Sequence, residues 1–339
     1  MTNPVLVEVL RGGRVESRHR GAVAVADADG ASVLAIGDVA TPMFPRSAVK
    51  ALQALALVET GAADRYGFGD EEFALACASH SGEPGHVAVV ERMLTQAGLD
   101  PSALCCGTHW PLYQPAASAL ARTGGPSALH NNCSGKHAGF LCVACAMGID
   151  HSGYWRPGHA VQRLVRATLE DLTGAVLSED RRGVDGCSVP TWAIPLQNFA
   201  QAFAKFGTGR GLLPGRARAA ARLRAACANK PWHVAGTGRL CTELMQLIGA
   251  RVFVKTGAEG VYCGALPEQG LGIAIKCDDG AGRAAQALIA AMIGRFLPLG
   301  DDQRAALAGF AHPMLRNWNG IEVGAVRVTD ALYSPRGGA

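Results

Sequence analysis

The chain has 339 residues, a formal net charge of +4, and 49% hydrophobic against 18% charged residues. This composition supports one large domain or two closely associated ones, and it excludes an intrinsically disordered chain. The arginines are dispersed, and the spacing of their densest group, residues 210–224, suits a solvated helix face, so we expect no nucleic-acid partner. The longest uncharged stretches, such as residues 138–149, are shorter than the about 20 residues that span a bilayer, so we expect no membrane segment.

The N-terminus and the cysteines indicate a reducing compartment. Residues 1–8 carry no basic segment, and neither an apolar core nor a cleavage site follows, so no signal peptide is predicted. We therefore expect a cytoplasmic protein. Its eleven cysteines, an odd number, are then predicted to be reduced thiols, buried small residues or metal ligands rather than a disulfide framework.

Taken in chain order, the predicted elements place strands at both ends and helices between them. Strands are predicted at 5–9, 22–26 and 33–36, and a three-stranded antiparallel meander at 251–255, 261–266 and 272–276. Helices are predicted at 48–59, 85–97, 116–121, 159–172, 216–227 and 282–297, with a buried apolar helix running to Met147 and a short strand-like run at 73–76.

These elements predict an α/β (α+β) fold in which one antiparallel sheet is assembled from both chain ends. The sheet part comprises residues 1–45 and 250–339, and the helical middle comprises residues 46–249. We expect the whole chain, 1–339, to form one catalytic domain with a helical subdomain. The crevice between the two parts is then the expected site.

Two short motifs carry the chemistry of a serine acyl-transfer enzyme. Ser47 and Lys50 form an early Ser-x-x-Lys, and Lys255 begins a late Lys-Thr-Gly. A spacing of three residues places a hydroxyl and an amine on one face of a helix, where the amine can take the proton that makes serine a nucleophile. The chain has only six lysines, and two of them lie in these motifs. An exposed helix with a solvated lysine is the alternative interpretation.

Cysteines beside glycine turns form a second group. Cys133 and His137 lie in the run 131–139, and Cys187 lies on a similar turn about fifty residues later. Thiolates and imidazoles are the ligands that zinc prefers, and three of them leave a position open for water or substrate. The spacing matches no zinc-finger pattern, so ordinary buried cysteines remain the alternative. Ser79, which begins a polar Ser-His-Ser in the run 77–83, is a candidate active-site residue or a helix-capping one.

Together these motifs resemble the rhizobial-type L-asparaginases, also called the asparaginase II family. The resemblance runs from Val15-Glu16-Ser17-Arg18-His19-Arg20 to Asn317-Trp318-Asn319-Gly320. Its distinctive pieces are Arg46-Ser47-Ala48-Val49-Lys50, Cys77-Ala78-Ser79-His80-Ser81, Asn132-Cys133-Ser134-Gly135-Lys136-His137, Asp185-Gly186-Cys187 and Lys255-Thr256-Gly257-Ala258-Glu259-Gly260.

The resemblance implies a serine β-lactamase/glutaminase-like fold, a homodimer, and hydrolysis of L-asparagine to L-aspartate and ammonia. It implies two serine–lysine pairs, which map to Ser47 with Lys50 and to Ser79 with Lys255. It also implies a zinc ion (Zn²⁺) held by Cys133, Lys136 and Cys187. His137, which the residue types alone favoured as a ligand, then becomes a substrate-binding residue, as does Asp185.

Two other functions fit parts of the pattern. A β-lactam-reactive serine hydrolase would also show Ser-x-x-Lys and Lys-Thr-Gly, but the chain has no Ser-Asp-Asn motif to accompany them. A non-enzymatic zinc-thiolate redox sensor would use Cys133 and Cys187 and leave the serines structural. The preference for asparagine over glutamine is not set by these motifs, because one methylene changes binding by only about 1–3 kcal/mol.

Overall fold

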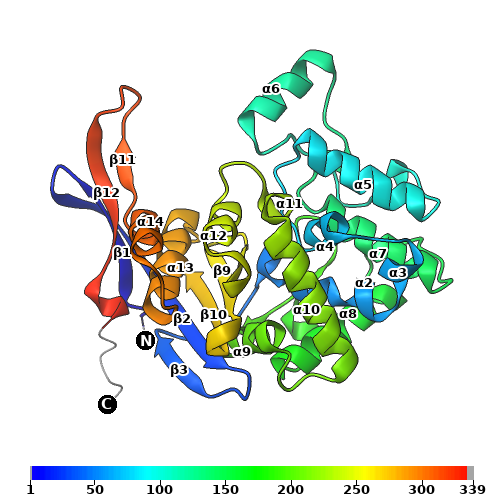
Figure 1. Cartoon of the computed structure of the whole chain (residues 1–339), viewed down its shortest axis with the longest axis horizontal. Coiled ribbons are helices and arrows are strands. Elements are labelled where there is room, and N and C mark those ends of the chain that lie inside the picture. Colours follow the sequence, from blue (N-terminus) through cyan, green and yellow to red (C-terminus); the bar gives the residue numbers. More distant parts are fainter. Residues whose placement is uncertain (1, 334–339) are drawn as a thin grey trace. The chain divides into compact units, whose positions relative to one another are not determined.

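The computed structural model describes residues 2–333. The chain divides into two compact units, each assembled from separate stretches of sequence. The first unit comprises Met1–Ala48, Ile194–Gly211 and Val254–Ala339, and the second comprises Val49–Ala193 and Leu212–Phe253. Figure 1 shows the whole chain and labels its elements where there is room.

The first unit is built on an eight-stranded sheet in the order β11-β12-β1-β2-β10-β9-β8, with β3 paired to β2. Its strands are β1 (Val5–Arg11), β2 (Arg14–Asp27), β3 (Ser32–Ile36), β8 (Phe253–Thr256), β9 (Val261–Leu266), β10 (Leu271–Cys277), β11 (Met314–Arg316) and β12 (Glu322–Val328). β10 pairs antiparallel with β2 and with β9, and β1 pairs antiparallel with β12. The sheet therefore joins the two ends of the chain, as predicted.

Helices cover both faces of the middle of this sheet. Ile273, Ala274 and Ile275 are successive residues of β10 and all are fully buried, although their side chains point to alternating faces. α9 (Leu196–Thr208) and α13 (Gly282–Phe296) pack against β9 and β10, and α14 (Asp301–Ala311) packs on α13. A two-stranded pair, β4 (Pro42–Met43) and β7 (Ile194–Pro195), and the 3₁₀ helix η1 (Arg46–Val49) complete the part that leads to the first motif.

The second unit is helical and is arranged around α7 (Ser134–Ala146), whose residues 134–144 are all buried. Its other helices are α1 (Lys50–Gln53), α2 (Leu55–Glu59), α3 (Ala62–Arg65), α4 (Asp70–Ala76), α5 (Pro84–Gln96), α6 (Gln114–Thr123), α8 (Ala160–Thr173), α10 (Pro214–Asn229), α11 (Pro231–Ala235) and α12 (Leu240–Ile248). A small hairpin of β5 (Arg182–Val184) and β6 (Pro190–Trp192) also belongs to this unit.

Three sequence predictions differ from the structure. The run 73–76 is not a strand but the end of α4, because the acidic first turn Asp70–Glu72 starts a helix that a four-residue apolar run cannot reveal. The helix predicted at 48–59 is broken into η1, α1 and α2, so Ser47 lies in a 3₁₀ turn rather than at the start of a long helix. The stretch 194–211 belongs with the sheet, whereas the sequence predicts it in the helical middle.

None of the eleven cysteines forms a disulfide. No helix within residues 2–333 combines the length and the apolar character that crossing a membrane requires.

Candidate active site

Lys50 is buried in the helical unit and contacts a predicted catalytic serine. Its side chain is only 1% exposed, and its Nζ donates hydrogen bonds to Ser79 Oγ at 2.9 Å and to the Asn132 carbonyl at 3.2 Å. An amine held against a hydroxyl in a buried setting can exchange a proton with it. The structure thus pairs Lys50 with Ser79, a contact that the resemblance did not assign.

The loop that carries Ser79 is fixed on both sides. The Ser79 N–H donates to the Val234 carbonyl at 3.0 Å, so this amide already has an acceptor. The next residue, His80, accepts from the Gly82 N–H at Nδ1, so its Nε2–H donates to Ser134 Oγ at 2.9 Å. Burial lowers the pKa of His80 well below its usual range and keeps the ring neutral. His80, which follows Ser79, therefore connects the Ser79 loop to the residue that follows Cys133.

A thiolate centre lies at the N-terminus of α7. The ligand atoms of Cys133, Asp185 and Cys187 lie within 4.8 Å of one another, and both cysteines are buried. These three residues could hold a metal ion. His137 is not part of this group, so the set of Cys133, His137 and Cys187 that residue types alone suggested is not formed.

The cysteines and lysines of this centre shift one another's pKa values. A hydrogen bond from Cys187 lowers the pKa of Cys133 well below its usual range, and the nearby amines of Lys50 and Lys136 add to this effect. Burial alone would lower the pKa of Lys136, but the sulfurs of Cys187 and Cys133 raise it overall. Lys136 Nζ donates to Cys187 Sγ at 2.9 Å. The amine of Lys136 is therefore held against the sulfurs of this centre.

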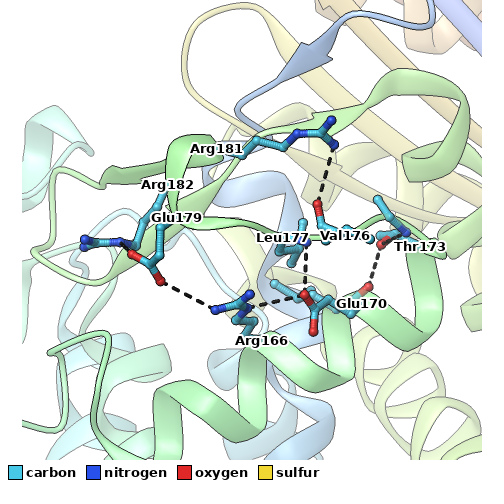
Figure 2. Close-up of polar contacts among 10 residues, drawn as sticks. Arg166, Glu170, Thr173, Val176, Leu177, Glu179, Arg181 and Arg182 are labelled. Carbon is cyan, nitrogen blue, oxygen red and sulfur yellow. Dashed lines mark hydrogen bonds and ion pairs between the residues drawn. The ribbon is translucent and has the colours of Figure 1, made fainter.

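The hairpin that carries Asp185 and Cys187 is anchored to α8 through both of its strands. Figure 2 shows the contacts near the first strand, β5. Arg166 binds Glu179 at 3.5 Å, and Glu179 binds Arg182 of β5 at 2.6 Å. The guanidinium of Arg166 also lies 4.8 Å from the ring centroid of Trp192, in β6. Arg166 therefore contacts both strands of the hairpin whose turn carries Asp185 and Cys187, two of the side chains that could hold a metal.

In the sheet unit, the two remaining catalytic candidates lie on neighbouring segments. Lys255 is 1% exposed on β8, and Ser47 is half-buried in η1. A Cβ at Gly257 would lie 2.6 Å from the Pro45 carbonyl oxygen, so the Lys-Thr-Gly backbone touches the turn that precedes Ser47. Cys263 Sγ also bridges the carbonyls of Ala48 and Lys255, each at 3.4 Å. The two sequence motifs are thus packed together.

Left-handed backbone geometry marks three of the predicted motifs. Among residues 2–333, the non-glycine residues with positive φ are Arg46, Ser188 and Glu259, at +50°, +78° and +58°. They lie beside Ser47, beside Cys187 and within the segment that follows Lys-Thr-Gly. Such a residue costs about 1–3 kcal/mol and persists only where the surroundings enforce it, as they commonly do at active sites.

Sequence reasoning missed three residues of this site. Tyr154 contacts His137, Arg166 anchors the hairpin, and Asn132 supplies a backbone acceptor to Lys50. Tyr154 and Arg166 lie outside every recognised motif, so no local signal identifies them. His80 lies inside the run around Ser79, but only the structure shows that it binds Ser134.

Comparison with known protein families gives a match over nearly the whole chain. The family described as L-asparaginase II matches residues 7–328. None of the curated proteins matches the chain. A similar solved structure is reported as "putative beta-lactamase from Bacteroides dorei"; it is 14% identical, the alignment covers 76% of this chain and 84% of that one, and the TM-score is 0.36. That likeness is too distant to bear on chemistry.

Proposed function

Because the chain belongs to the L-asparaginase II family, we propose that it hydrolyses L-asparagine to L-aspartate and ammonia by acyl transfer to a serine. The observation that carries this proposal is the buried contact of 2.9 Å between Lys50 Nζ and Ser79 Oγ. It provides a path for a proton between an amine and a hydroxyl, which amide hydrolysis requires on both sides of the acyl intermediate.

In the proposed reaction Ser47 is the nucleophile. Lys50, in its neutral form, takes the Ser47 proton, and Oγ attacks the side-chain carboxamide carbon. The C–N bond then breaks, ammonia leaves with a proton delivered through Ser79, and an aspartyl ester of Ser47 forms. Water hydrolyses this ester, passing one proton back to the serine. Lys255 is proposed as the second catalytic amine, because it begins the Lys-Thr-Gly motif and is buried.

The cysteine centre is proposed to bind zinc. Two buried sulfurs within 4.8 Å of a carboxylate oxygen match the ligand preferences of this metal. Cys133 and Cys187 would hold it, with Lys136 as the third ligand by resemblance and Asp185 as the alternative. Lys136 would have to lose its proton, which the charge of a bound metal favours. When bound, zinc would supply a fixed positive charge that orients the substrate's α-amino and α-carboxylate groups. The homodimer and the cytoplasmic location remain predictions from the sequence.

The order of the serines is tested by ammonia release and intact-mass spectrometry on three variants. Ser47→Ala should release no ammonia and form no adduct. Ser79→Ala should turn over slowly and accumulate an aspartyl adduct on Ser47. Ser118→Ala, at an exposed position on α6, should behave as wild type. Ammonia release that persists in Ser47→Ala would contradict the assigned nucleophile, and a zinc-loaded wild type that releases none would contradict the function itself.

A further inference from the structure

A half-buried histidine in the loop before α6 binds the residue whose carbonyl holds Lys50. His109 Nε2 accepts a hydrogen bond from the Asn132 N–H at 2.9 Å, and its Nδ1 lies 2.7 Å from the Trp110 carbonyl oxygen. Because Nε2 receives an N–H, it carries no proton, and Nδ1–H is the donor to the Trp110 carbonyl. Both ring nitrogens of His109 therefore have partners in the neutral Nδ1–H tautomer. His109 lies outside every motif recognised in the sequence.

The backbone of Asn132 is fixed on both sides of its Cα. Its N–H donates to His109, and its carbonyl accepts the hydrogen bond from Lys50 at 3.2 Å. The N–H in the same peptide plane as this carbonyl donates to Asn131 Oδ1 at 2.9 Å. The side-chain nitrogen of Asn131 in turn donates to two carbonyl oxygens of residues 106–109, at 2.8 and 3.1 Å. Residues 106–109 therefore hold both peptide planes that flank the Asn132 Cα.

The Asn132 carbonyl determines how the amine of Lys50 is oriented. In the proposed reaction Lys50 is a neutral amine, which has two hydrogens and one lone pair. A carbonyl oxygen can only accept, so Asn132 takes one of these hydrogens, and Ser79 Oγ, at 2.9 Å from Nζ, takes the other. The lone pair then points away from both acceptors, free to receive the proton of the nucleophile. With the Asn132 carbonyl displaced, the amine would rotate about its remaining hydrogen bond, and the lone pair would lose its fixed direction.

The same loop also contacts the segment that carries Ser79. The Leu112 N–H donates to the Ser81 carbonyl at 2.8 Å. A Cβ at Gly82 would lie 3.1 Å from the Pro111 Cα, so the two backbones are closely packed. Residues 106–112 therefore touch the backbones that present both acceptors of Lys50, and His109 is the side chain by which they hold Asn132.

We propose that His109 is a positioning residue for Lys50: its Nε2 holds the Asn132 N–H and thereby fixes the carbonyl that orients the Lys50 amine against Ser79. The inference rests on the proposed function for the catalytic role of Lys50. Because His109 acts through Lys50, its loss should slow the chemical step and leave the affinity for substrate unchanged.

The tautomer is tested without substrate by NMR on wild-type protein labelled with ¹⁵N-histidine. The His109 signals are identified by their loss in His109→Gln. The expected spectrum shows a protonated Nδ1 and an unprotonated Nε2 that accepts a hydrogen bond. A proton on Nε2 would overturn the proposal, because such a nitrogen cannot accept the Asn132 N–H.

The hold on Asn132 is tested by hydrogen exchange of its amide, followed by mass spectrometry. His109→Leu removes the acceptor, whereas His109→Gln places an amide oxygen at about the reach of Nε2. Exchange at Asn132 should be faster in His109→Leu than in the wild type and slow again in His109→Gln. Equal exchange in all three proteins would refute the positioning role. If His109→Leu is poorly folded, His109→Asn replaces it, because this polar side chain is too short to reach the Asn132 N–H.

Steady-state kinetics connect this contact to catalysis. For L-asparagine, kcat should fall about tenfold in His109→Leu, which is about what one hydrogen bond contributes, with KM unchanged. His109→Gln should stay close to the wild type. His159→Leu is the matched control: the half-buried His159 also accepts a backbone N–H, from Val161 at 3.2 Å, and contacts the Asp150 carbonyl at 2.8 Å, and its loss should leave kcat unchanged. A raised KM with unchanged kcat, or equal losses in His109→Leu and His109→Gln, would overturn the assignment.

Metal content distinguishes this role from an effect on Cys133, which follows Asn132. Zinc bound per chain in His109→Leu should equal that of the wild type. A loss of kcat in proportion to lost zinc would overturn the proposal, because His109 would then act on the metal ligand rather than on Lys50. Failure of the proposed function would instead appear as no ammonia release from the wild type, while the NMR and exchange results would stand.

Discussion

Two glycines one helical turn apart on α7 should respond in opposite ways to the same substitution. Both Gly135 and Gly139 are buried. A Cβ at Gly135 would lie 2.4 Å from the Leu75 carbonyl oxygen and 2.7 Å from Leu75 Cγ. At Gly139 the nearest atom would be the Ala76 Cβ at 3.7 Å, which is an ordinary van der Waals contact. The first glycine lets α7 approach α4 closely, and the second does not.

The magnitudes follow from this geometry. Replacing a helical glycine by alanine stabilises the helix by about 0.8–1 kcal/mol, and Gly139→Ala should gain about that amount. At Gly135 the new Cβ falls about 1.0 Å short of the 3.4 Å at which contacts become ordinary, and the opposing atom is backbone, which cannot rotate away. Overpacking of this kind costs about 1–3 kcal/mol or more. We expect Gly135→Ala to lower the free energy of unfolding by about 2 kcal/mol.

Urea denaturation of the two variants, followed by circular dichroism, measures both changes in one experiment. The midpoint should rise for Gly139→Ala and fall for Gly135→Ala, with unchanged slopes. Zinc affinity should weaken in Gly135→Ala, because the displaced turn precedes Lys136. Equal midpoints for the two variants would show that α7 and α4 are not packed as closely as the backbone contact at Leu75 requires.

Three further predictions concern other parts of the two units. Gly257→Ala should lower kcat about a hundredfold in ammonia-release assays while circular dichroism stays unchanged, because its Cβ would displace the turn before Ser47. Burial lowers the pKa of His86 from 6.5 to about 4, so the folded protein does not take up the proton that the unfolded chain binds below pH 6.5. The free energy of unfolding should therefore fall by up to about 3 kcal/mol between pH 6.5 and about 4, and His86→Gln should remove that part of the fall. Arg166→Ala should weaken zinc binding about tenfold in chelator competition, whereas Arg163→Ala, on the same helix, should leave it unchanged.

The sequence was most informative where chemistry depends on short spacing. The mixed fold with one sheet from both chain ends was predictable, because β-branched runs with glycine breaks occur at both ends of the chain. Cys133 and Cys187 could be recognised as a pair, because each is a cysteine on a glycine turn, and the structure brings them together. Ser79 was identified from its polar run, and it lies against a buried lysine.

The rest depended on long-range contacts that leave no local pattern. Within the stretch 194–211, α9 packs on the sheet, yet no sequence signal says that a helix from the middle of the chain packs on strands from its ends. Phe73 begins an apolar run too short to distinguish a strand from the end of a helix. The contact of Lys50 with Ser79 joins residues 29 positions apart, and a motif search that pairs lysines with nearby serines cannot find it.

Three residues with a left-handed backbone lie in or beside the sequence motifs, although only the structure reveals their conformation. Arg46, Ser188 and Glu259 each adopt a left-handed conformation that their own side chains disfavour, so nothing in their identity predicts it. Each nevertheless lies in or beside a motif that the sequence had singled out for its chemistry. A conformation that costs about 1–3 kcal/mol is held only if the packing around it is worth more, and the close approach of Gly257 to Pro45 shows such packing beside Arg46. The fold therefore maintains destabilising backbone conformations at the positions where the motifs predict reaction chemistry.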